Sequence, residues 1–588
     1  MGFTRRDLLK FTGGSVAGLA LTPVPWSLLR DSSLVSETWP GVPRPKRGEI
    51  RIRYTACTLC PAGCGVRARC VGDQPVSLTG VAGHPAGGAL CTAGLVGHHL
   101  AICSDRVNGP LAHNRPASIE SIRTSVAAAI AGCAPHESVA ILDPRPGRTA
   151  SLVYRRFLAS LPNGLHCVPA GTQGLGAYGI DLENTRAIVS FGEPVLDGWL
   201  SPGRVLAARS HIQLIQIEPA YSRTASLADL WVPLPPGTEE VFAAAVQRAV
   251  EGDSNDPKAT EVARILLRNQ PAIAIGPGAA VAKLNGALGS IGKPGGFLPR
   301  RDFTPAVDIA SVPDHSIRVV IVEESAGADG TDWDLLRRKL VSQDATVVAL
   351  TAWLDGCARH ADYVVPAPLY LEALDEAPTP EGSTVASFSL SPALLQAKTQ
   401  ALSPADFILR LAAGSGSYVD ALKQRVAAIQ KERRGTLFTY ENGANTPISK
   451  IASADDLWKT MQAGAVWCDD PATTGVRSAS LPFTAREAQN PVPTPEFPLI
   501  LIAADRPSRH ASPLMSKLYR ESGLRRSADA AAVHPATGRD HGLVAGCRAI
   551  VRNPAATLTV QIVFDPAVMP GVIEMAGQDI SPASIRKA

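Results

Sequence analysis

The sequence predicts a multidomain α/β fold, and three features of the chain support this prediction. Short apolar runs alternate with amphipathic helical stretches through the central chain, as at Val139–Leu142 followed by the helical pattern from Ala150 to Leu161. A glycine-rich segment with four cysteines precedes this alternation, and closely spaced short strands follow it. Alternating strands and helices are typical of parallel sheets covered by helices, whereas short strands close together favour a small β-barrel.

The composition is that of a globular protein with several domains. The 588 residues are 45% hydrophobic, which is ample for sizeable cores. The 57 basic and 53 acidic residues give a net charge of only +4, so nothing indicates nucleic-acid binding. No segment after the N-terminal one approaches about eighteen consecutive apolar residues, so we expect no transmembrane body.

The N-terminal segment, residues 1–30, predicts export by the twin-arginine route. The pair Arg5-Arg6 precedes a weakly hydrophobic stretch, 13–21, that is rich in glycine and alanine. Two prolines interrupt the apolar run, which is therefore too short for an ordinary membrane span. No clean small-x-small cleavage site follows, so an uncleaved signal that serves as an anchor is an alternative to a signal that is removed. We expect the protein in the periplasm or on the outer face of the cytoplasmic membrane.

The strongest chemical signal is a set of four cysteines with the spacing C-x2-C-x3-C-x26-C: Cys57, Cys60, Cys64 and Cys91. Three thiols in one tight loop and a fourth from a later turn suit a [4Fe–4S] cluster, because its four irons take thiolates from different directions. A structural zinc site more often uses two paired knuckles, and disulfide frameworks are typical of smaller exported domains. Both alternatives stay open, but the spacing favours an iron–sulfur cluster.

The cluster is expected in an N-terminal domain over residues 48–115, which has strand candidates at Ile50–Tyr54 and Val76–Thr79. Strands and helices then alternate through a first α/β region at 116–300 and a second at 301–413. The strands expected in these two regions are Val139–Leu142, Ala187–Phe191, Gln213–Ile217, Ala272–Ile275, Val319–Val322, Thr346–Leu350 and Tyr363–Val365.

The C-terminal part of the chain predicts a different architecture. Residues 414–494 are expected to form an irregular or helical connector, with a helical pattern at Val419–Lys431. A proline-rich boundary ends this connector, and residues 495–588 are expected to form a β-barrel. The candidate strands of the barrel are Leu499–Ala503, Arg548–Arg552, Thr557–Phe564 and Val572–Ala576.

The cluster segment, the two α/β regions and the barrel resemble, in that order, the molybdopterin oxidoreductase family, also called the dimethyl sulfoxide reductase family. The motifs that carry the resemblance are Asp105-Arg106, Gly109-Pro110, Asp181 to Pro194, Glu218-Pro219, Thr224 to Asp229, Pro236 to Glu239, Asp362 to Pro366 with Glu372, and Pro570-Gly571-Val572. Each motif is weak alone, but their order over most of the chain is specific. The resemblance implies an oxidoreductase in which two molybdopterin guanine dinucleotides hold molybdenum or tungsten.

The resemblance also implies which residues bind the pterin dinucleotides. Gly192, Gly237 and Thr238 would offer backbone N–H groups to pyrophosphate, as loops at strand and helix ends do. Glu218 belongs to the same set, and Glu239 would accept hydrogen bonds from a guanine edge. The family usually has Asp where this chain has Glu239, and the sequence from Gly237 onward is equally typical of a helix N-cap.

Three departures from the family bear on the metal site. Ala93, two residues after Cys91, stands where the family commonly has Lys or Arg between cluster and pterin. Cys167 is the only thiol near the expected position of the molybdenum ligand, and a buried inert thiol is its alternative role. The chain is also shorter than most catalytic members. In these respects it resembles the compact exported subunits of quinone-linked complexes of the menaquinone reductase and alternative complex III type.

These resemblances imply an exported iron–sulfur electron-transfer subunit, with or without molybdenum, while its catalytic residues stay unknown. Its implied partners are an iron–sulfur or cytochrome c subunit and a quinone-binding membrane subunit. One alternative is a catalytic molybdenum enzyme that acts on a small sulfur, nitrogen or arsenic oxoanion. A second alternative is a scaffold subunit without a redox role.

Overall fold

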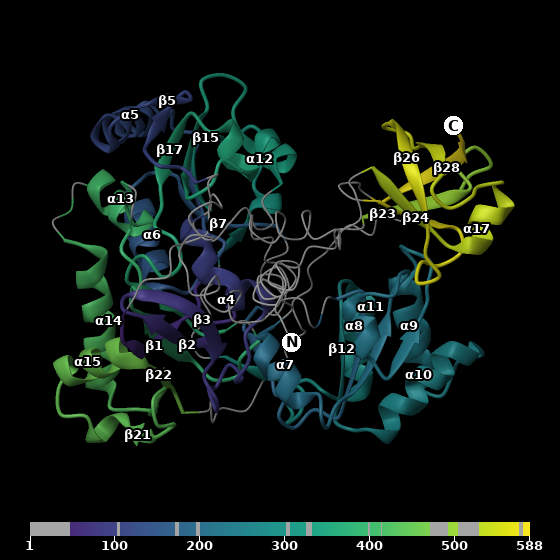
Figure 1. Ribbon diagram of the computed structural model, residues 1–588, viewed down its shortest axis with the longest axis horizontal. Coiled ribbons are helices and arrows are strands. Elements are labelled where there is room, and N and C mark those ends of the chain that lie inside the picture. Colours follow the sequence, from purple (N-terminus) through teal and green to yellow (C-terminus); the bar gives the residue numbers. More distant parts are fainter. Residues whose placement is uncertain are drawn as a thin grey trace, which may run out of the picture.

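The computed structural model describes residues 48–102, 106–170, 176–193, 195, 200–300, 306–324, 332–380, 382–397, 400–412, 414, 416–470, 492–503, 529–575 and 580–588. The export signal predicted at residues 1–30 lies outside them. Figure 1 shows a large body formed around an extended sheet, a second α/β unit beside it, and the C-terminal barrel above that unit. The mixed α/β architecture and the C-terminal barrel confirm these parts of the predicted fold class, and the iron–sulfur nature of the N-terminal domain stays a prediction.

The N-terminal unit is a three-stranded antiparallel sheet in the order β1-β2-β3. Its strands are β1 (Ile50–Ala56), β2 (Gly65–Val71) and β3 (Gln74–Gly80). A short helix α4 (Thr92–Val96) and the 3-10 helix η1 (Gly97–Ile102) follow. Both strands predicted in this unit are confirmed. Its loop between β1 and β2 and the residue before α4 hold the four predicted ligand cysteines.

The largest sheet has eight strands in the order β14-β7-β6-β15-β16-β17-β4-β5, and its central pairs are parallel. Alternate residues of its strands point to opposite faces. On one face Val139, Ile141 and Ile321 pack with helices α5, α6, α13 and α14, and on the other Leu142 and Val320 pack with α12 and the 3-10 helix η3. The strands of this sheet are β4 (Leu111–Ala112), β5 (Arg115–Pro116), β6 (Ser138–Leu142), β7 (Gly164–Val168), β14 (Val307–Asp308), β15 (Ile317–Glu324), β16 (Thr346–Thr351) and β17 (Tyr363–Pro366).

Helices cover both faces of this large sheet (Figure 1). They are α5 (Ile119–Ala131), α6 (Thr149–Ala159), α12 (Trp333–Lys339), α13 (Pro404–Leu411) and α14 (Tyr418–Glu432), with the 3-10 helices η2 (Ile309–Ser311) and η3 (Gly356–His360). Because both faces are buried, the central strands are continuous apolar runs.

A four-stranded parallel sheet in the order β11-β10-β9-β12 forms a separate unit inserted between β7 and β14. It contains β9 (Ala187–Phe191), β10 (Gln213–Ile217), β11 (Leu230–Val232) and β12 (Ala272–Ile275), with helices α7 (Pro202–Ala208), α8 (Arg223–Leu227), α9 (Glu239–Val250), α10 (Pro257–Arg268) and α11 (Ala279–Leu288). The antiparallel pair β8 (Tyr178–Ile180) and β13 (Phe297–Pro299) lies at the two ends of this insertion.

The predicted division into α/β regions at residue 300 does not match the boundary between these two sheets. The eight-stranded sheet takes β6 and β7 from the region at 116–300 and β14 to β17 from the region at 301–413. Apolar runs indicate that strands exist, but they do not show which strands pair across a long insertion. The sequence therefore located the strands and misplaced the boundary.

Residues 375–468 contribute a five-stranded sheet in the order β18-β19-β22-β20-β21. Its strands are β18 (Asp375–Ala377), β19 (Ser387–Ser391), β20 (Thr436–Thr439), β21 (Asn445–Pro447) and β22 (Ala465–Cys468), with helix α15 (Ala454–Gly464) and the 3-10 helix η4 (Ile448–Lys450). The prediction of an irregular or helical connector at 414–494 was incomplete, because it missed three of these strands. They are short and polar at their exposed positions, which leaves little periodic signal.

The C-terminal residues form a closed barrel in the order β23-β27-β24-β26-β25-β28, as predicted. Its elements are β23 (Leu499–Ala503), β24 (Ala530–Val533), α17 (Pro535–Asp540), β25 (Arg548–Arg552), β26 (Thr557–Phe564), β27 (Val572–Met575) and β28 (Ser581–Lys587). The Tyr221 N–H donates to the Ala567 carbonyl oxygen at 2.7 Å, and the Met569 N–H to that of Pro219 at 3.0 Å. These bonds join the barrel to the loop after β10.

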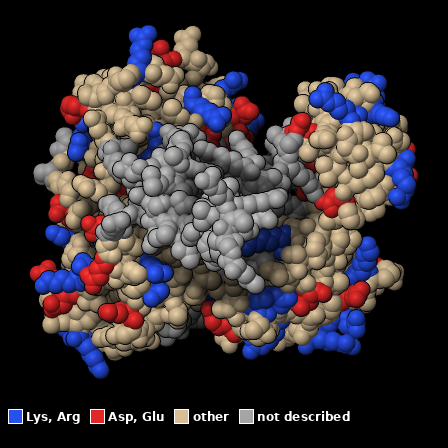
Figure 2. All heavy atoms as spheres, in the orientation of Figure 1, with Lys and Arg blue, Asp and Glu red and all other residues tan. Residues whose placement is uncertain are grey.

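Among the residues that the structure describes, no helix combines the length and apolarity needed to cross a membrane. Basic and acidic side chains are interspersed over the face shown in Figure 2, as expected for a net charge of +4.

Candidate metal–sulfur site and the charge network beside it

The structure brings the four predicted cysteines together at one end of the N-terminal sheet. Cys57 and Cys64 are each only 5% exposed and belong to one apolar cluster, against which Cys60 and Cys91 pack. The Cys57 N–H donates to the Cys64 carbonyl oxygen at 2.8 Å, which closes the loop between β1 and β2. None of the four thiols is in a disulfide. Two distant chain segments thus supply four thiols to one buried site.

The thiols of this site are difficult to ionise without a compensating cation. Burial raises the pKa of Cys57 well above its usual range, and the charges of Cys60, Cys64 and Cys91 raise it further. Burial followed by the charges of Cys60 and Cys91 likewise raises the pKa of Cys64. Since a metal ligand must be a thiolate, a positively charged metal group would relieve this repulsion. The donor set therefore fits a metal–sulfur group.

The geometry of the donors bears on which group it is. In the described part of the chain, no three His, Cys, Asp or Glu side chains converge closely enough to hold a single metal ion. A zinc ion would draw its sulfur ligands to about 2.3 Å from one centre. A [4Fe–4S] cluster instead separates its thiolates, because each binds a different iron. The four grouped cysteines match the number of thiolates that such a cluster takes.

Close backbone contacts hold the cysteine loops against neighbouring elements. A Cβ atom on Gly87 would lie 2.0 Å from the Gly203 carbonyl carbon, so the chain before Cys91 meets the first turn of α7 directly. The Ser201 hydroxyl donates to the Ala86 carbonyl oxygen, and Ser201 Oγ lies 3.9 Å from Cys64 Sγ. The cysteine site is thereby fixed against the inserted α/β unit.

A buried histidine fixes the site on its other side. A Cβ atom on Gly65, the residue after Cys64, would lie 2.4 Å from His84 Cδ2. His84 Nε2 lies 3.2 Å from the Tyr440 hydroxyl, and its Nδ1 accepts the Ala86 N–H at 3.0 Å. Burial lowers the pKa of His84 to about 3, so the ring is neutral. His84 joins the cysteine loops to the five-stranded sheet as a structural side chain.

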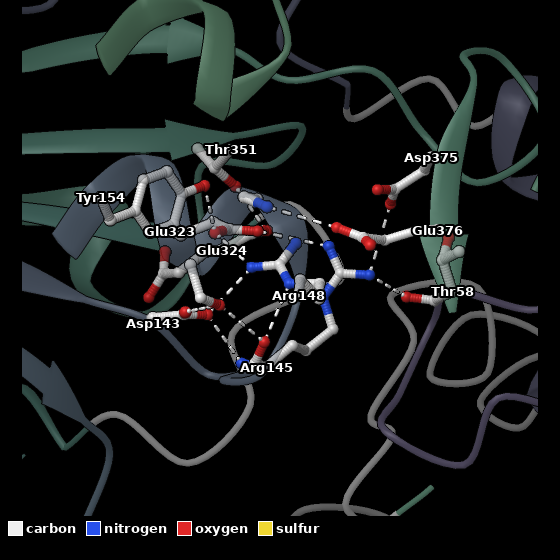
Figure 3. Close-up of polar contacts among 12 residues, drawn as sticks. Thr58, Asp143, Arg145, Arg148, Tyr154, Glu323, Glu324, Thr351, Asp375 and Glu376 are labelled. Carbon is white, nitrogen blue, oxygen red and sulfur yellow. Dashed lines mark hydrogen bonds and ion pairs between the residues drawn. The ribbon is translucent and has the colours of Figure 1, made fainter. Parts of the chain in front are cut away.

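A buried network of charged residues lies beside the cysteine loop (Figure 3). Arg148 Nη2 bonds to Asp143 Oδ1 at 2.9 Å and to Glu323 Oε2 at 2.6 Å. Arg145 Nη2 bonds to Glu323 Oε1 at 3.2 Å, and its Nη1 donates to the Thr58 carbonyl oxygen at 2.6 Å. The network begins at the carboxyl ends of β6 and β15 and reaches the residue after Cys57.

The arginines keep the acidic groups of this network ionised. Burial opposes ionisation of Glu323, but Arg148 and then Arg145 outweigh it and lower its pKa. Burial opposes ionisation of Asp143 as well, yet Arg148 and the hydrogen bond with His166 hold its pKa below the usual range. Both carboxylates are therefore paired with positive charge in the folded protein.

A third acidic residue closes the network near β18. The Glu376 carboxylate accepts the N–H groups of Thr149 and Ala150, which begin helix α6, and the Tyr418 hydroxyl at 2.9 Å. It thus caps a helix whose own N-cap residue provides no side-chain bond. Burial raises the pKa of Glu376. A cavity of about 40 Å³ lies between this network and the cysteine loop. Thr58, Arg145 and Tyr418 line it.

The residues predicted to bind pterin dinucleotides lie together at the carboxyl edge of the four-stranded sheet. Gly192 follows β9, Glu218 follows β10, and Gly237 and Thr238 precede α9, whose first residue is Glu239. The Gly192 N–H already donates to the Ile217 carbonyl oxygen at 2.9 Å, and the Thr238 N–H to that of Pro235 at 3.2 Å. These two N–H groups are engaged within the fold. Their assignment stays a prediction.

The remaining predicted metal-site residues have the contacts of core side chains. Cys167 is fully buried in β7, among the apolar residues that pack against α12, and burial raises its pKa to about 12. Its assignment as a molybdenum ligand stays a prediction that these contacts do not support. Ala93 is 5% exposed and packs in the same apolar cluster as Cys57, so its position supplies no charge to the site.

The sequence did not identify the Arg145–Glu323 network or the role of Thr58. The available signal was the placement of charged residues directly after buried apolar strands, as in Arg145 to Arg148 after β6 and Glu323-Glu324 at the end of β15. Such positions are often solvated strand ends, so the pattern alone does not indicate burial.

Comparisons with known proteins were made on the whole chain. No family model matches it. It is 24% identical to the menaquinone reductase, molybdopterin-binding-like subunit of Nitratidesulfovibrio vulgaris over 675 aligned positions, which cover 98% of this chain and 93% of that protein. A stretch of 95 residues is 35% identical to the dimethyl sulfoxide reductase DmsA of Haemophilus influenzae and covers 15% of this chain and 12% of that protein.

A solved structure shares the fold. Acetylene hydratase from Pelobacter acetylenicus superposes with a TM-score of 0.63 at 14% identity, covering 89% of this chain and 92% of that chain. At this identity the likeness concerns the fold alone. Together with the two sequence relatives, it confirms the resemblance that the ordered motifs predicted.

Proposed function

We propose that this chain, which resembles the molybdopterin oxidoreductase family over its full length, is an electron-transfer subunit with a [4Fe–4S] cluster on its four grouped cysteines. The observation that carries the proposal is the grouping of Cys57, Cys60, Cys64 and Cys91 from two chain segments in and against one apolar cluster without disulfides.

The place of the chain in a respiratory complex is supported by its relative. The protein that matches over nearly the whole chain is named as a subunit of menaquinone reductase. A quinone-linked complex would supply a membrane subunit for the quinone and an iron–sulfur or cytochrome c subunit as electron partner. The twin-arginine pattern supports export, since this route carries proteins that are already folded around their cofactors. We therefore place the chain on the periplasmic side of the cytoplasmic membrane.

The protein's own residues would hold and insulate the cluster. When bound, the cluster supplies one-electron transfer. The cysteines ligate it, and the apolar side chains of Leu59, Leu90 and Leu100 around them exclude water. Arg145 brings positive charge to the loop through the Thr58 carbonyl oxygen. This charge reaches the loop between β1 and β2. The family commonly has its basic residue at the position of Ala93, which lies on the other cysteine-bearing segment, after Cys91.

Metal analysis of the protein purified without oxygen tests the proposal. We expect about four irons and four sulfides per chain, and an electron paramagnetic resonance signal after reduction. Cys91→Ala should lose the signal. Cys70→Ala is the matched control, because Cys70 is buried in the same cluster of residues but lies in β2, outside the ligand set. An iron-free wild-type protein, or equal iron loss in both variants, would refute the proposal.

A catalytic molybdenum enzyme is the second candidate, favoured by the names of the two relatives. The engaged N–H groups of Gly192 and Thr238 and the buried position of Cys167 weigh against it. The same metal analysis separates the two. One molybdenum or tungsten per chain with released pterin would establish the catalytic alternative.

A further inference from the structure

Tyr370 lies against the cysteine site from the loop between β17 and β18. It is 5% exposed and belongs to the same apolar cluster as Cys57 and Leu59. A Cβ atom on Gly97, at the start of η1, would lie 2.5 Å from Tyr370 Cε1, so the ring rests directly on that backbone. The absence of a side chain at Gly97 is what allows the tyrosine to approach the cysteines.

The hydroxyl of Tyr370 is the unusual part of this side chain. It is buried, and no described residue makes a hydrogen bond of ordinary geometry with it. Burial raises the pKa of Tyr370 well above its usual range, and Cys57 raises it more than Cys64 or Cys91 does. Of the neighbouring cysteine side chains, Cys57 interacts most strongly with the hydroxyl, and both residues belong to the same apolar cluster. A buried polar group without a partner is destabilising, which calls for a compensating role.

The backbone that carries Tyr370 is held in a strained conformation. Leu371 has a φ of +74°, which is rare for a residue with a branched side chain. Its carbonyl oxygen accepts the N–H groups of Leu394 and Leu395, each at 2.8 Å. Such strain persists only where neighbouring contacts enforce it, and it is common at functional sites.

A buried ion pair secures the other end of this turn. Arg106 donates from Nη1 and Nη2 to the two oxygens of Glu372 at 2.6 and 2.5 Å, and both side chains are at most 4% exposed. Glu372 Oε2 also accepts the Leu369 N–H at 3.1 Å. The residues on both sides of Tyr370 are thus fixed, which aims its ring at the cysteines.

We infer that Tyr370 donates a hydrogen bond to the Cys57 sulfur when the cluster is bound and thereby raises the reduction potential of the cluster. This inference rests on the proposed function. In the reduced cluster the ligand sulfur carries more negative charge than in the oxidised cluster, so a donor stabilises the reduced state more. The hydroxyl donates a hydrogen bond in this step and transfers no proton.

One other hydroxyl lies near the cysteines, and the structure argues against it as the donor. Ser201 Oγ lies 3.9 Å from Cys64 Sγ, but its proton is directed at the Ala86 carbonyl oxygen. Water in the cavity that Tyr370 lines is the alternative hydrogen-bond acceptor for this hydroxyl, since the space suffices for water. In that case the cluster potential would not depend on the hydroxyl.

The test is the Tyr370→Phe variant, which keeps the ring and removes only the hydroxyl. Redox titration followed by electron paramagnetic resonance should give unchanged iron content and a more negative midpoint potential. Electron–nuclear double resonance should show the loss of one exchangeable proton coupled to the reduced cluster. Tyr418→Phe is the matched control. The buried hydroxyl of Tyr418 faces the same cavity but bonds to Asp375 and Glu376. The midpoint potential of the cluster in this variant should therefore equal that of the wild type.

The outcomes separate this inference from the proposed function. A cluster with the same potential in wild type and Tyr370→Phe overturns the inference and leaves the proposed function standing. Equal shifts in both variants overturn it as well, because they reflect a general change in the cavity. A wild-type protein without a cluster refutes the proposed function and the inference together.

Discussion

Arg145 Nη1 donates a hydrogen bond of 2.6 Å to the carbonyl oxygen of Thr58, the residue that follows Cys57. The guanidinium is 6% exposed and also bonds to Glu323. One buried cation thus connects the carboxyl edge of the large sheet to the loop that carries three of the four cysteines. The Arg145 side chain thus both holds this loop in place and brings a positive charge to it.

Replacement of Arg145 by Met should destabilise the protein and loosen the cysteine loop. Glu323 would lose one of its two arginine partners while fully buried, and breaking a buried ion pair from one side costs about 3–5 kcal/mol. We expect a lower free energy of unfolding in denaturant titrations and a lower iron content. Arg123→Met removes an exposed pair with Glu120 and is the control, for which neither quantity should change. A stable Arg145→Met protein with full iron content would contradict the anchoring role.

The loss of unfolding free energy at acidic pH should depend on Asp143. Its pKa is lowered in the folded state, so its pairing stabilises the protein fully above the ordinary carboxylate value of about 4. This contribution is lost as the pH falls through that value toward the folded pKa. Unfolding free energies measured from pH 7 down to pH 3 should fall, and Asp143→Asn should be less stable at pH 7 but show a shallower decline. Parallel curves for the two proteins would refute this assignment.

The sequence predicted the central strands well because they are buried on both faces. Ala187–Phe191, Gln213–Ile217 and Ala272–Ile275 coincide with β9, β10 and β12. Strands covered by helices on both sides are continuous apolar runs, which are visible without knowledge of their partners. The pairing of β6 with β15 was not visible, since more than a hundred residues of inserted chain separate the two strands. Pairing is a tertiary property that short periodicities do not encode.

The cysteine site was predicted as a set because ligand spacing is a local property of the chain. Its environment was not, because Tyr370, Arg145 and Glu323 acquire their roles only through packing. A tyrosine after an apolar strand reads as an ordinary core residue. Two arginines after β6 read as a solvated strand end, and only the structure shows that they are buried between carboxylates.

Replacement of Gly97 by Ala should act on the cluster through Tyr370. The added Cβ would lie 2.5 Å from Tyr370 Cε1, so the ring must move away from the cysteines. We expect a more negative midpoint potential, in the same direction as for Tyr370→Phe. Gly109→Ala is the control, because a Cβ atom at Gly109 meets nothing within 4 Å. An unchanged potential in Gly97→Ala would show that the position of the ring does not affect the cluster.

Replacement of Gly87 by Ala should separate the cysteine loop from the inserted α/β unit. Gly87 has a φ of +85°, and a Cβ atom there would lie 2.0 Å from the Gly203 carbonyl carbon. Gly72→Ala is the control for the cost of a side chain at positive φ alone. Gly72 has a φ of +58°, but no atom lies within 4 Å of the added Cβ. This cost lowers the free energy of unfolding by about 1–2 kcal/mol for a residue in a left-handed conformation. If the Gly87–Gly203 contact positions Cys91, only Gly87→Ala should also lose iron. Equal unfolding free energies and full iron in both variants would mean that the contact is incidental to the site.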